Sequence, residues 1–233
     1  MVALFFVGNI LTMSKEVILT EDGSHTLRME EIDECYHSTH GAVQESMYIF
    51  IDAGLKRFLT NGGHEVNILE IGFGTGLNAY LTLVEAEKLG LRIHYTAIEL
   101  YPLPVNDAIQ LNYPEYLGLK RALFEKIHYL PWNNNNDVTP YFCLDKINCD
   151  YTNYILSGQY NVIYFDAFSP EKQPEMWTED GFRKIYRCSG DGAVITTYCA
   201  KGTVRRTMGS VGFSMERLPG PPGKREILRG QKQ

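Results

Sequence analysis

The stretch LEIGFGTGLN, residues 69–78, constrains the fold of this chain more than any other part of the sequence. An apolar run ends in an acid, three glycines follow at alternate positions, and helix-forming residues come next. Glycine allows a tight turn and lets another group approach the backbone, so the pattern predicts a β-strand that turns directly into an α-helix. The Gly-x-Gly-x-Gly spacing differs from the dinucleotide fingerprint and lacks the Lys-Ser/Thr pair of a P-loop. Phosphate is therefore not the expected ligand, and plain turn chemistry is the alternative explanation of the glycines.

Strand-like and helix-like segments alternate along most of the chain. Short β-type runs occur at 66–71, 93–99, 142–150, 160–166 and 192–198. Helix-compatible segments lie between them, near 77–89, 103–112, 151–157, 175–187 and 201–210. Such alternation predicts an α/β fold with a mostly parallel, doubly wound sheet and helices on both faces.

The two ends of the chain have a different pattern. Residues 17–29 predict two strands about a turn at Asp22-Gly23, and residues 41–59 carry apolar side chains at helical spacing. Near the other end, residues 213–218 and 225–230 flank the turn-rich PGPPG and predict an antiparallel hairpin.

Two polar or atypical segments complete the organisation. The NNNND run at 133–137 predicts a surface loop between a helix and a strand. Residues 1–15 are a candidate disordered N-terminal extension, with Met1 or Met13 as the start, because their apolar opening is too short for a membrane span and lacks the basic region of a signal peptide. We therefore expect residues 16–233 to form a single domain.

The charge is distributed unevenly, although the chain as a whole has a net charge of -6. Residues 183–233 hold 11 Lys and Arg against 3 Asp and Glu, so this basic end could bind phosphate locally. A solvated basic surface is the alternative. The five cysteines form no Cys-x-x-Cys pair, which favours reduced thiols in a cytoplasmic protein over disulfides or a zinc site.

Two acids close the strands that follow the glycine turn. Glu99 ends the second predicted strand, where a carboxylate can accept hydrogen bonds from both hydroxyls of a ribose. Asp150 ends the third, at the position that would meet an adenine edge, although a helix cap or a surface charge explains it equally well. Together with the glycine turn, the two acids predict a nucleoside pocket at one edge of the sheet.

These residues resemble a known site. LEIGFGTG followed by AIE resembles the S-adenosylmethionine site of class I methyltransferases, and the terminal hairpin is similar to the antiparallel end of their seven-stranded sheet. The resemblance implies S-adenosyl-L-methionine as the methyl donor and no metal. It implies that Glu70 lies near the methionine amino group and that Glu99 binds the ribose. The donor site that it implies consists of Glu45, Glu70, Gly72, Gly74, Thr75, Gly76, Asn78, Glu99 and Asp150.

A second stretch is more specific. YFDAFSPEKQPEMW, residues 164–177, resembles the DGFAPxxNPxMW signature of the bacterial MnmC-type tRNA methyltransferases, with Ala167 in place of the usual glycine. The segments at 34–50, 200–213 and 220–230 resemble other parts of that family in the same order, so the resemblance runs from about residue 16 to the end.

The family resemblance implies a reaction. These enzymes methylate 5-aminomethyl-2-thiouridine at the wobble position of tRNA, giving the 5-methylaminomethyl product. Members of the fused type also carry a flavin (FAD) oxidase domain, for which this sequence has no second dinucleotide fingerprint. The implied activity is therefore methyl transfer alone, with a separate enzyme supplying the aminomethyl-uridine precursor.

The expected acceptor site centres on Asp166, at the end of the fourth predicted strand. Its carboxylate could orient the acceptor amine and accept its proton, and the alternative is a helix cap. Phe168 could stack on the uracil or pack its loop, while Pro170 would rigidify that loop. The candidate tRNA-binding residues are Lys201, Arg205, Arg206, Lys224 and Arg225.

Two other functions remain open from the sequence. The first is a class I methyltransferase that acts on a small amine or a protein. The second is an aminopropyltransferase or donor-binding module that uses the same pocket without methyl transfer. The basic C-terminal end favours tRNA, whereas the acidic remainder keeps the alternatives open.

Overall fold

The computed structural model of the protein describes residues 14–30, 33–60, 62 and 65–233. Residues 1–13 of the expected N-terminal extension lie outside the described residues, and Lys15 already belongs to a strand. Every helix within the described ranges is too short or too polar to cross a membrane.

The main sheet is mixed and mostly parallel, with strand order β10-β11-β9-β8-β4-β5-β7-β6 among the described residues. Its strands are β4 (Glu65–Ile71), β5 (Arg92–Glu99), β6 (Asn134–Thr139), β7 (Phe142–Asn148), β8 (Tyr160–Phe165), β9 (Ser189–Thr197), β10 (Ser214–Pro219) and β11 (Glu226–Gln231). The pairs β4–β5, β4–β8, β5–β7 and β8–β9 are parallel. The hairpin β10–β11 is antiparallel, and β11 pairs antiparallel with β9. This confirms the predicted α/β fold and its terminal hairpin.

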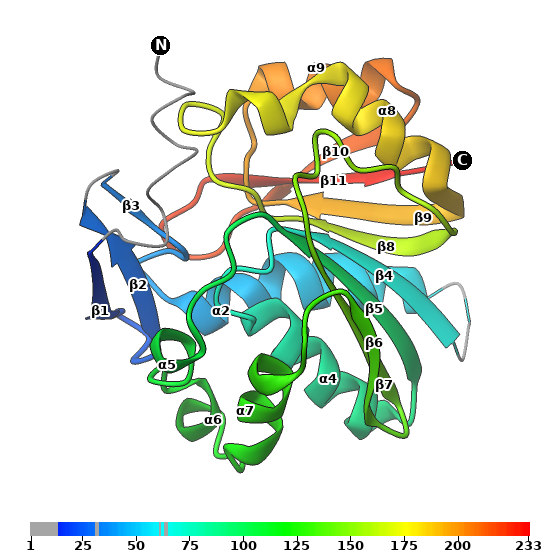
Figure 1. The fold of residues 1–233 in the computed structure, drawn as a ribbon. Helices are drawn as coiled ribbons and strands as arrows, with labels where there is room; N and C mark the ends of the chain where they lie inside the picture. The colour runs from blue at the N-terminus through cyan, green and yellow to red at the C-terminus, as the bar shows by residue number, and fades with distance from the viewer. Residues whose placement is uncertain (1–13, 31–32, 61, 63–64) are drawn as a thin grey trace.

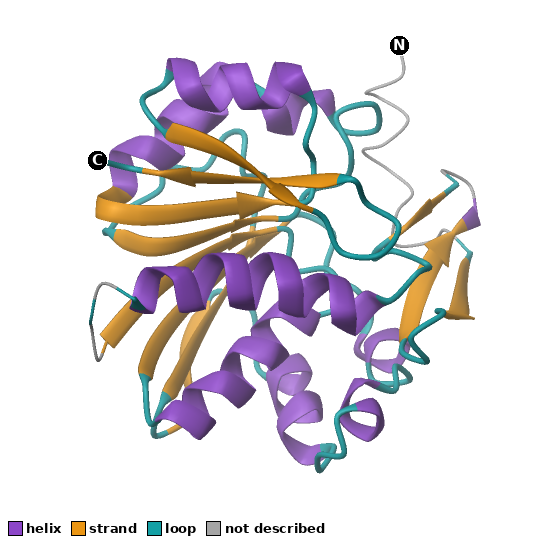
Figure 2. Cartoon of the chain, turned by 180° about the vertical axis from the view of Figure 1, so that it is seen from behind, coloured by secondary structure: helices purple, strands orange, loops and turns teal. Residues whose placement is uncertain are grey.

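Helices cover both faces of this sheet (Figures 1 and 2). The α-helices are α2 (Ala42–Ser46), α3 (Arg57–Leu59), α4 (Leu77–Leu89), α5 (Val105–Ala108), α6 (Tyr113–Tyr116), α7 (Ala122–Tyr129), α8 (Glu179–Cys188) and α9 (Gly202–Ser210). A π-helix, η3 (Met47–Lys56), joins α2 to α3, and a 3₁₀ turn, η4 (Pro174–Trp177), precedes α8. The helical segment predicted at 41–59 is thus present as α2, η3 and α3 in succession.

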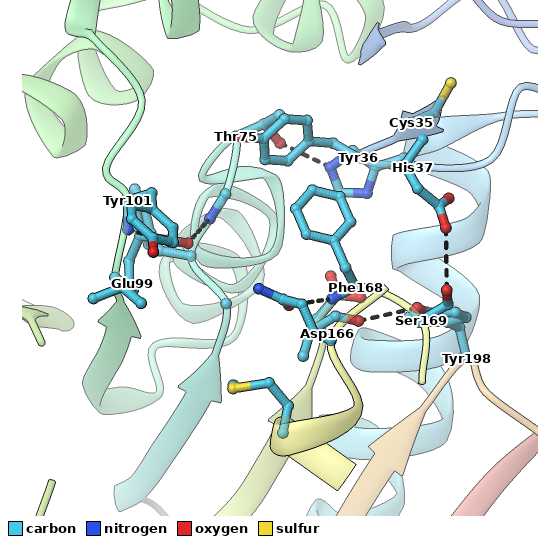
Figure 3. A pocket seen from close by; sticks show the side chains of 18 of the residues that line it. Cys35, Tyr36, His37, Thr75, Glu99, Tyr101, Asp166, Phe168, Ser169 and Tyr198 are labelled. Atoms are coloured by element: carbon cyan, nitrogen blue, oxygen red, sulfur yellow. Dashed lines mark hydrogen bonds between the residues drawn. The ribbon is translucent and has the colours of Figure 1, made fainter. Parts of the chain in front are cut away.

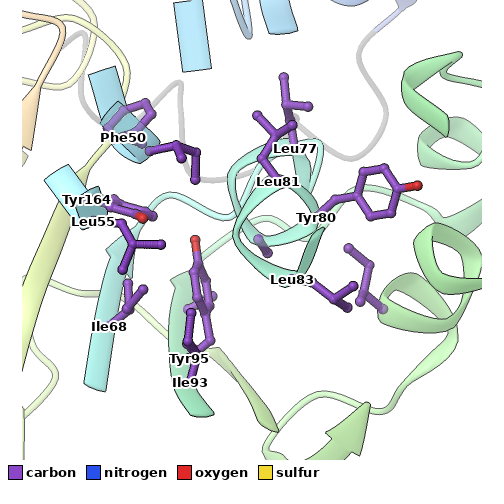
Figure 4. Close-up of a cluster of buried hydrophobic side chains, with 14 of the residues drawn as sticks. Phe50, Leu55, Ile68, Leu77, Tyr80, Leu81, Leu83, Ile93, Tyr95 and Tyr164 are labelled. Atoms are coloured by element: carbon purple, nitrogen blue, oxygen red, sulfur yellow. The ribbon is translucent and has the colours of Figure 1, made fainter. Parts of the chain in front are cut away.

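Side chains of the central strands alternate between two cores, as the period of a β-strand requires. Val66 and Ile68 of β4 point to the face covered by η3 and α4, where they pack in the cluster drawn in Figure 4. Leu69 and Ile71 point to the opposite face, under α8 and α9. The same alternation decides where the side chain of Glu70, within β4, points.

A smaller sheet stands beside the carboxyl ends of the main strands (Figure 1). It consists of β1 (Lys15–Leu19), β2 (His25–Met29) and β3 (Glu34–Cys35), in that order and antiparallel. The predicted turn is confirmed, because the Asp22 carboxylate accepts a 2.8 Å hydrogen bond from the backbone N–H of Ser24. The chain then passes along one wall of the central cavity before it enters α2.

Two predictions of local structure were wrong, and one predicted helix is shorter than expected. Residues 134–137 of the NNNND run belong to strand β6, which pairs antiparallel with β7, so the described sheet has eight strands and not seven. An edge strand needs a hydrogen-bonded neighbour on one side only, and it tolerates exposed polar side chains. Residues 151–157 form a single turn, and 103–112 contain only the four-residue helix α5. At 151–157, the Asp150 carboxylate accepts from the backbone N–H of Thr152, which favours a local turn over a helix.

Candidate active site

The glycine turn lies between β4 and α4, as predicted, and all three glycines have positive φ: 93° at Gly72, 48° at Gly74 and 71° at Gly76. Gly72 is the most constrained, because a Cβ there would lie 2.6 Å from the backbone oxygen of Asp166. A Cβ at Gly74 would lie 3.0 Å from the Tyr36 ring. The backbone after β8 and the N-terminal segment therefore pack directly against the glycine turn, and glycine leaves the space for this contact.

Glu99, the last residue of β5, contacts the backbone of this turn through its carboxylate. One carboxylate oxygen accepts from the backbone N–H of Gly74 at 3.1 Å, and the other accepts from the N–H of Tyr101 at 2.8 Å. Burial raises the pKa of Glu99, while the backbone hydrogen bonds oppose that rise. Figure 3 shows Glu99 and Tyr101 on one side of the cavity, with Asp166 and Phe168 across from them.

Glu70 does not line the cavity, contrary to its expected role beside the donor. Strand alternation turns its side chain to the face covered by α4, where it is fully buried. Its carboxylate accepts a 3.0 Å hydrogen bond from the Asn78 side chain. Burial, and then the negative charge of Asp166, raise the pKa of Glu70 well above its usual value. Burial thus favours the protonated form of Glu70, which lies beneath the turn and does not line the cavity.

Asn78 is also placed differently from the expectation, because it lies in the first turn of α4 under the glycine turn. Its amide donates both to Glu70 and, at 2.8 Å, to the carboxylate of Asp166. Asn78 therefore positions Asp166 and does not line the cavity.

Asp166 lines the cavity just beyond β8. Burial raises its pKa to about 7, although the hydrogen bond from Asn78 opposes the shift. The helix-cap alternative does not apply, since the next α-helix, α8, is capped by Thr178, whose hydroxyl accepts from the N–H of Gly181. A carboxyl group with a pKa near 7 can exchange a proton at neutral pH.

An aromatic wall stands beside Asp166. The rings of Phe168 and Tyr36 meet edge to face with centroids 5.3 Å apart. The Phe168 backbone is fixed on both sides, because its N–H donates to Gln173 and its carbonyl accepts from the Trp177 indole at 2.9 Å. The Trp177 side chain is itself buried. Tyr36 and Tyr198, which also line the cavity, were not singled out from the sequence. The only signal for Tyr36 was its position within the motif-like segment 34–50.

The cavity has a volume of about 610 Å³ and lies at the carboxyl ends of β4, β5, β7 and β8. Nine of the predicted site residues line it: Glu45, Gly72, Gly74, Thr75, Glu99, Asp150, Asp166, Phe168 and Lys224. The other predicted residues do not contribute to its lining: Glu70, Gly76, Asn78, Pro170, Lys201, Arg205, Arg206 and Arg225.

Two lining residues are engaged in local contacts. The Asp150 carboxylate accepts from the N–H and hydroxyl of Thr152, at 2.8 and 2.7 Å, so it stabilises a local turn and does not cap a helix. The Thr75 hydroxyl lies 2.8 Å from Nε2 of His37. Burial lowers the pKa of His37 to about 4, so its ring is neutral at pH 7. The described residues contain no group of three or more His, Cys, Asp or Glu that could hold a metal ion.

The basic residues fall into two environments. Arg205 and Arg206 are exposed on α9, Arg225 is exposed on the loop between β10 and β11, and Lys201 forms an ion pair with Glu171. Lys224, expected to contact phosphate, is directed into the cavity instead. Its ammonium lies 3.0 Å from the Glu45 carboxylate and 4.9 Å from the centroid of the Tyr198 ring.

The cavity fits a nucleoside-containing methyl donor. Its volume lies within the range of about 300–1,000 Å³ typical of small-ligand sites. Glu99 presents a half-buried carboxylate beside the glycine turn, where ribose hydroxyls can donate to it. The fold and this site together define the class of S-adenosyl-L-methionine-dependent methyltransferases.

Comparison with known proteins supports that class. Residues 128–233 match a family model described as S-adenosyl-L-methionine-dependent methyltransferase. The chain is 30% identical over 236 residues to the tRNA 5-methylaminomethyl-2-thiouridine biosynthesis bifunctional protein MnmC of Pseudomonas syringae pv. tomato, covering 94% of this chain and 35% of that protein. It is 33% identical over 222 residues to the protein of the same name from Pseudomonas fluorescens, covering 88% of this chain and 33% of the relative.

A solved structure shows the same fold. MNMC2 from Aquifex aeolicus superposes with a TM-score of 0.77 at 23% identity, covering 97% of this chain and 72% of that one. Part of the chain thus matches a methyltransferase family, and most of the chain is similar to one part of the MnmC proteins that its motifs resemble. It spans about a third of the length of the two Pseudomonas relatives.

The close approach at Gly72 predicts a specific loss of stability. Gly72→Ala should reduce the free energy of unfolding by about 2–4 kcal/mol, combining the strain of a positive φ with a collision against the Asp166 backbone. Gly158→Ala is the matched control, since Gly158 has a φ of 92° but open space around it. Its cost should be only about 1–2 kcal/mol. Equal costs in urea unfolding would contradict the steric argument.

Proposed function

We propose that this chain transfers a methyl group from S-adenosyl-L-methionine to the amine of 5-aminomethyl-(2-thio)uridine at the tRNA wobble position. The observation that carries the proposal is Asp166, a cavity-lining carboxyl with a pKa of about 7 beside the Phe168–Tyr36 wall. The names of the MnmC relatives support it. The proposal covers methyl transfer by residues 16–233 as one catalytic unit, with a separate enzyme supplying the aminomethyl precursor.

The bound donor supplies an activated methyl group on its sulfonium, so the protein must mainly bind, align and desolvate the reactants. Glu99 and the backbone of the Gly72–Gly74 turn hold the nucleoside part of the donor. Asp166 accepts a hydrogen bond from the acceptor amine and takes its proton, since an amine attacks in its neutral form. Asn78 keeps the Asp166 carboxylate in place through its 2.8 Å hydrogen bond.

The aromatic wall offers a surface for the acceptor base. A single-stranded uracil can stack on an aromatic ring once it leaves the anticodon stack. Phe168 is held for this purpose by its contacts to Tyr36, Gln173 and Trp177.

The exposed basic residues lie at the same edge as the cavity. Residues 220–225 join β10 to β11 next to the carboxyl end of β9, because Leu228 pairs with Thr197. The N-terminal turn of α9, which carries Arg205, follows the same end of β9. A tRNA bound at the cavity would bring phosphates within reach of both segments. We place the reaction in the cytoplasm, which suits the five free cysteines.

The direct test of this proposal uses the purified protein, S-adenosyl-L-methionine and tRNA that carries an aminomethyl group on its wobble uridine. Mass spectrometry of the digested nucleosides should show the wobble nucleoside heavier by one methylene. A wobble nucleoside that stays unmodified while the protein binds the donor would contradict tRNA methylation.

Asp166→Asn should separate catalysis from binding. The substitution keeps the size and the hydrogen bond to Asn78 but removes the proton acceptor, so the single-turnover rate should fall about 10²–10⁴-fold. The wild-type rate should rise with pH through about 7, as Asp166 ionises, and the variant should lack that rise. Affinity for the product S-adenosylhomocysteine should change little. A variant with the normal rate and pH profile would exclude Asp166 as the base.

Replacement of Arg205, Arg206 and Arg225 by Gln should weaken tRNA binding and flatten its dependence on salt, by about one unit of slope for each phosphate that the variant no longer neutralises. The matched control replaces Lys88, Arg92 and Arg187, which lie at the opposite edge of the sheet. It removes the same charge and should leave the slope largely intact. Equal slopes in the two triple variants would mean that the basic end is only a solvated surface.

A further inference from the structure

Gln173 lies on the cavity wall beside Phe168, and only one end of its side-chain amide is used to support the Phe168 backbone. The side chain is half-buried and lines the cavity. The backbone of Gln173 is held on both sides, since its N–H donates to the carbonyl of Ser169 at 2.9 Å and its carbonyl accepts from the N–H of Met176 at 3.1 Å. The residue thus has a fixed place directly before η4.

The side-chain amide of Gln173 has a defined orientation. Its Oε1 accepts a 3.1 Å hydrogen bond from the backbone N–H of Phe168 (Figure 3). Only the oxygen of an amide can accept this bond, so the contact fixes which end of the amide meets the Phe168 backbone. The Nε2 end carries two N–H donors, and these form no hydrogen bond with the part of the chain that the structure describes. The free end of Gln173 is therefore a hydrogen-bond donor.

This donor lies next to the groups proposed to bind the acceptor base. The Phe168 ring forms the aromatic wall with Tyr36, and Asp166 precedes Phe168 by two residues. All three line the same cavity as Gln173. An aminomethyluracil that stacks on Phe168 with its amine at Asp166 brings its C5 carbon to this part of the wall. Because C4 is bonded to C5 and C2 lies across the ring, we expect the C4 substituent to meet Gln173.

The C4 substituent is the group that distinguishes the two pyrimidine bases. Uracil has a C4 oxygen, which accepts hydrogen bonds, whereas cytosine has a C4 amino group, which donates them. The Nε2 group of Gln173 can pair with the oxygen, but two donors would meet if it faced an amino group, and each would lose a partner. A sulfur atom at C2 leaves the C4 oxygen in place, so 2-thiouracil presents the same acceptor.

We propose that Gln173 identifies the acceptor base by donating a hydrogen bond from Nε2 to the C4 oxygen of uracil. The protein then accepts uracil or 2-thiouracil and rejects a cytosine that carries the same aminomethyl group. The inference rests on the proposed function and adds the identity of the base to it. Asp166 acts on the amine, whereas Gln173 acts on the base that bears the amine.

The test uses two anticodon stem-loop RNAs that differ only at the wobble position, with 5-aminomethyluridine in one and 5-aminomethylcytidine in the other. Wild-type protein should methylate the uridine RNA with a kcat/KM about 10–100-fold higher, the scale of one hydrogen bond made against one donor left unpaired. Gln173→Glu keeps the size and an oxygen for the Phe168 N–H, but it replaces Nε2 by a second acceptor. The preference for uridine should therefore fall at least about tenfold.

The ratio of the two RNAs separates base selection from other effects of the substitution. Both RNAs carry the same amine, so the added negative charge cancels in the ratio. The matched control is Gln110→Glu, which adds the same charge at an exposed residue outside the cavity lining and should keep the wild-type ratio. Affinity for S-adenosylhomocysteine should stay within about twofold in Gln173→Glu, which shows that the cavity is folded.

Two results would overturn the proposal. One is a wild-type protein that methylates both RNAs equally. The other is an equal loss of rate on both RNAs in Gln173→Glu, which would make Gln173 only a support of the Phe168 loop. Fluorescence anisotropy of the same RNAs distinguishes failure of the proposed function. A binding preference for the uridine RNA that Gln173→Glu removes, without methyl transfer by the wild type, would refute methylation and leave the base selection standing.

Discussion

The passage of the chain through Gly72 is the constraint on which the rest of the structure depends. The N–H of Gly72 donates to the carbonyl of Ile98 on β5, and the N–H of Asp166 donates to the carbonyl of Ile71 on β4, both at 2.9 Å. The glycine turn is thereby held between two neighbouring strands, and only a residue without a Cβ fits against the Asp166 backbone. Because the turn is fixed there, the groups around it converge on one cavity at the switch point of the sheet.

Several acidic side chains lie close together around the turn, and each has a different environment that limits the repulsion between them. Glu70 lies beneath the turn, where burial favours its protonated form. Glu99 is stabilised by backbone N–H groups, and Glu45 by Lys224. Burial raises the pKa of Asp166 to about 7, so this carboxyl group is set to exchange a proton near neutral pH.

The sequence predicted correctly the helices, turns and strand ends that depend on neighbouring residues in the chain. Helix α4 coincides with the predicted 77–89, because Gly76 and Gly90 bound it with left-handed conformations. The placement of the acids after β5 and β8 followed from strand ends. The orientation of Glu70 depends on which face of the sheet each residue of β4 points to. The motif resemblance carried no information about that. The direction of Lys224 depended on packing of its loop against His40, and β6 depended on pairing with β7. Such long-range contacts leave no periodicity in the sequence.

The central claim is that the glycine turn and Glu99 form the donor pocket, and calorimetric titration of S-adenosyl-L-methionine into Glu99→Ala tests it most directly. The loss of a half-buried carboxylate that would accept from the ribose should weaken binding by about 1.5–3 kcal/mol relative to wild type. Asp150→Ala should cost less, since the Asp150 carboxylate is already engaged with Thr152. Equal affinity of Glu99→Ala and wild type, in a variant that remains folded, would contradict the account.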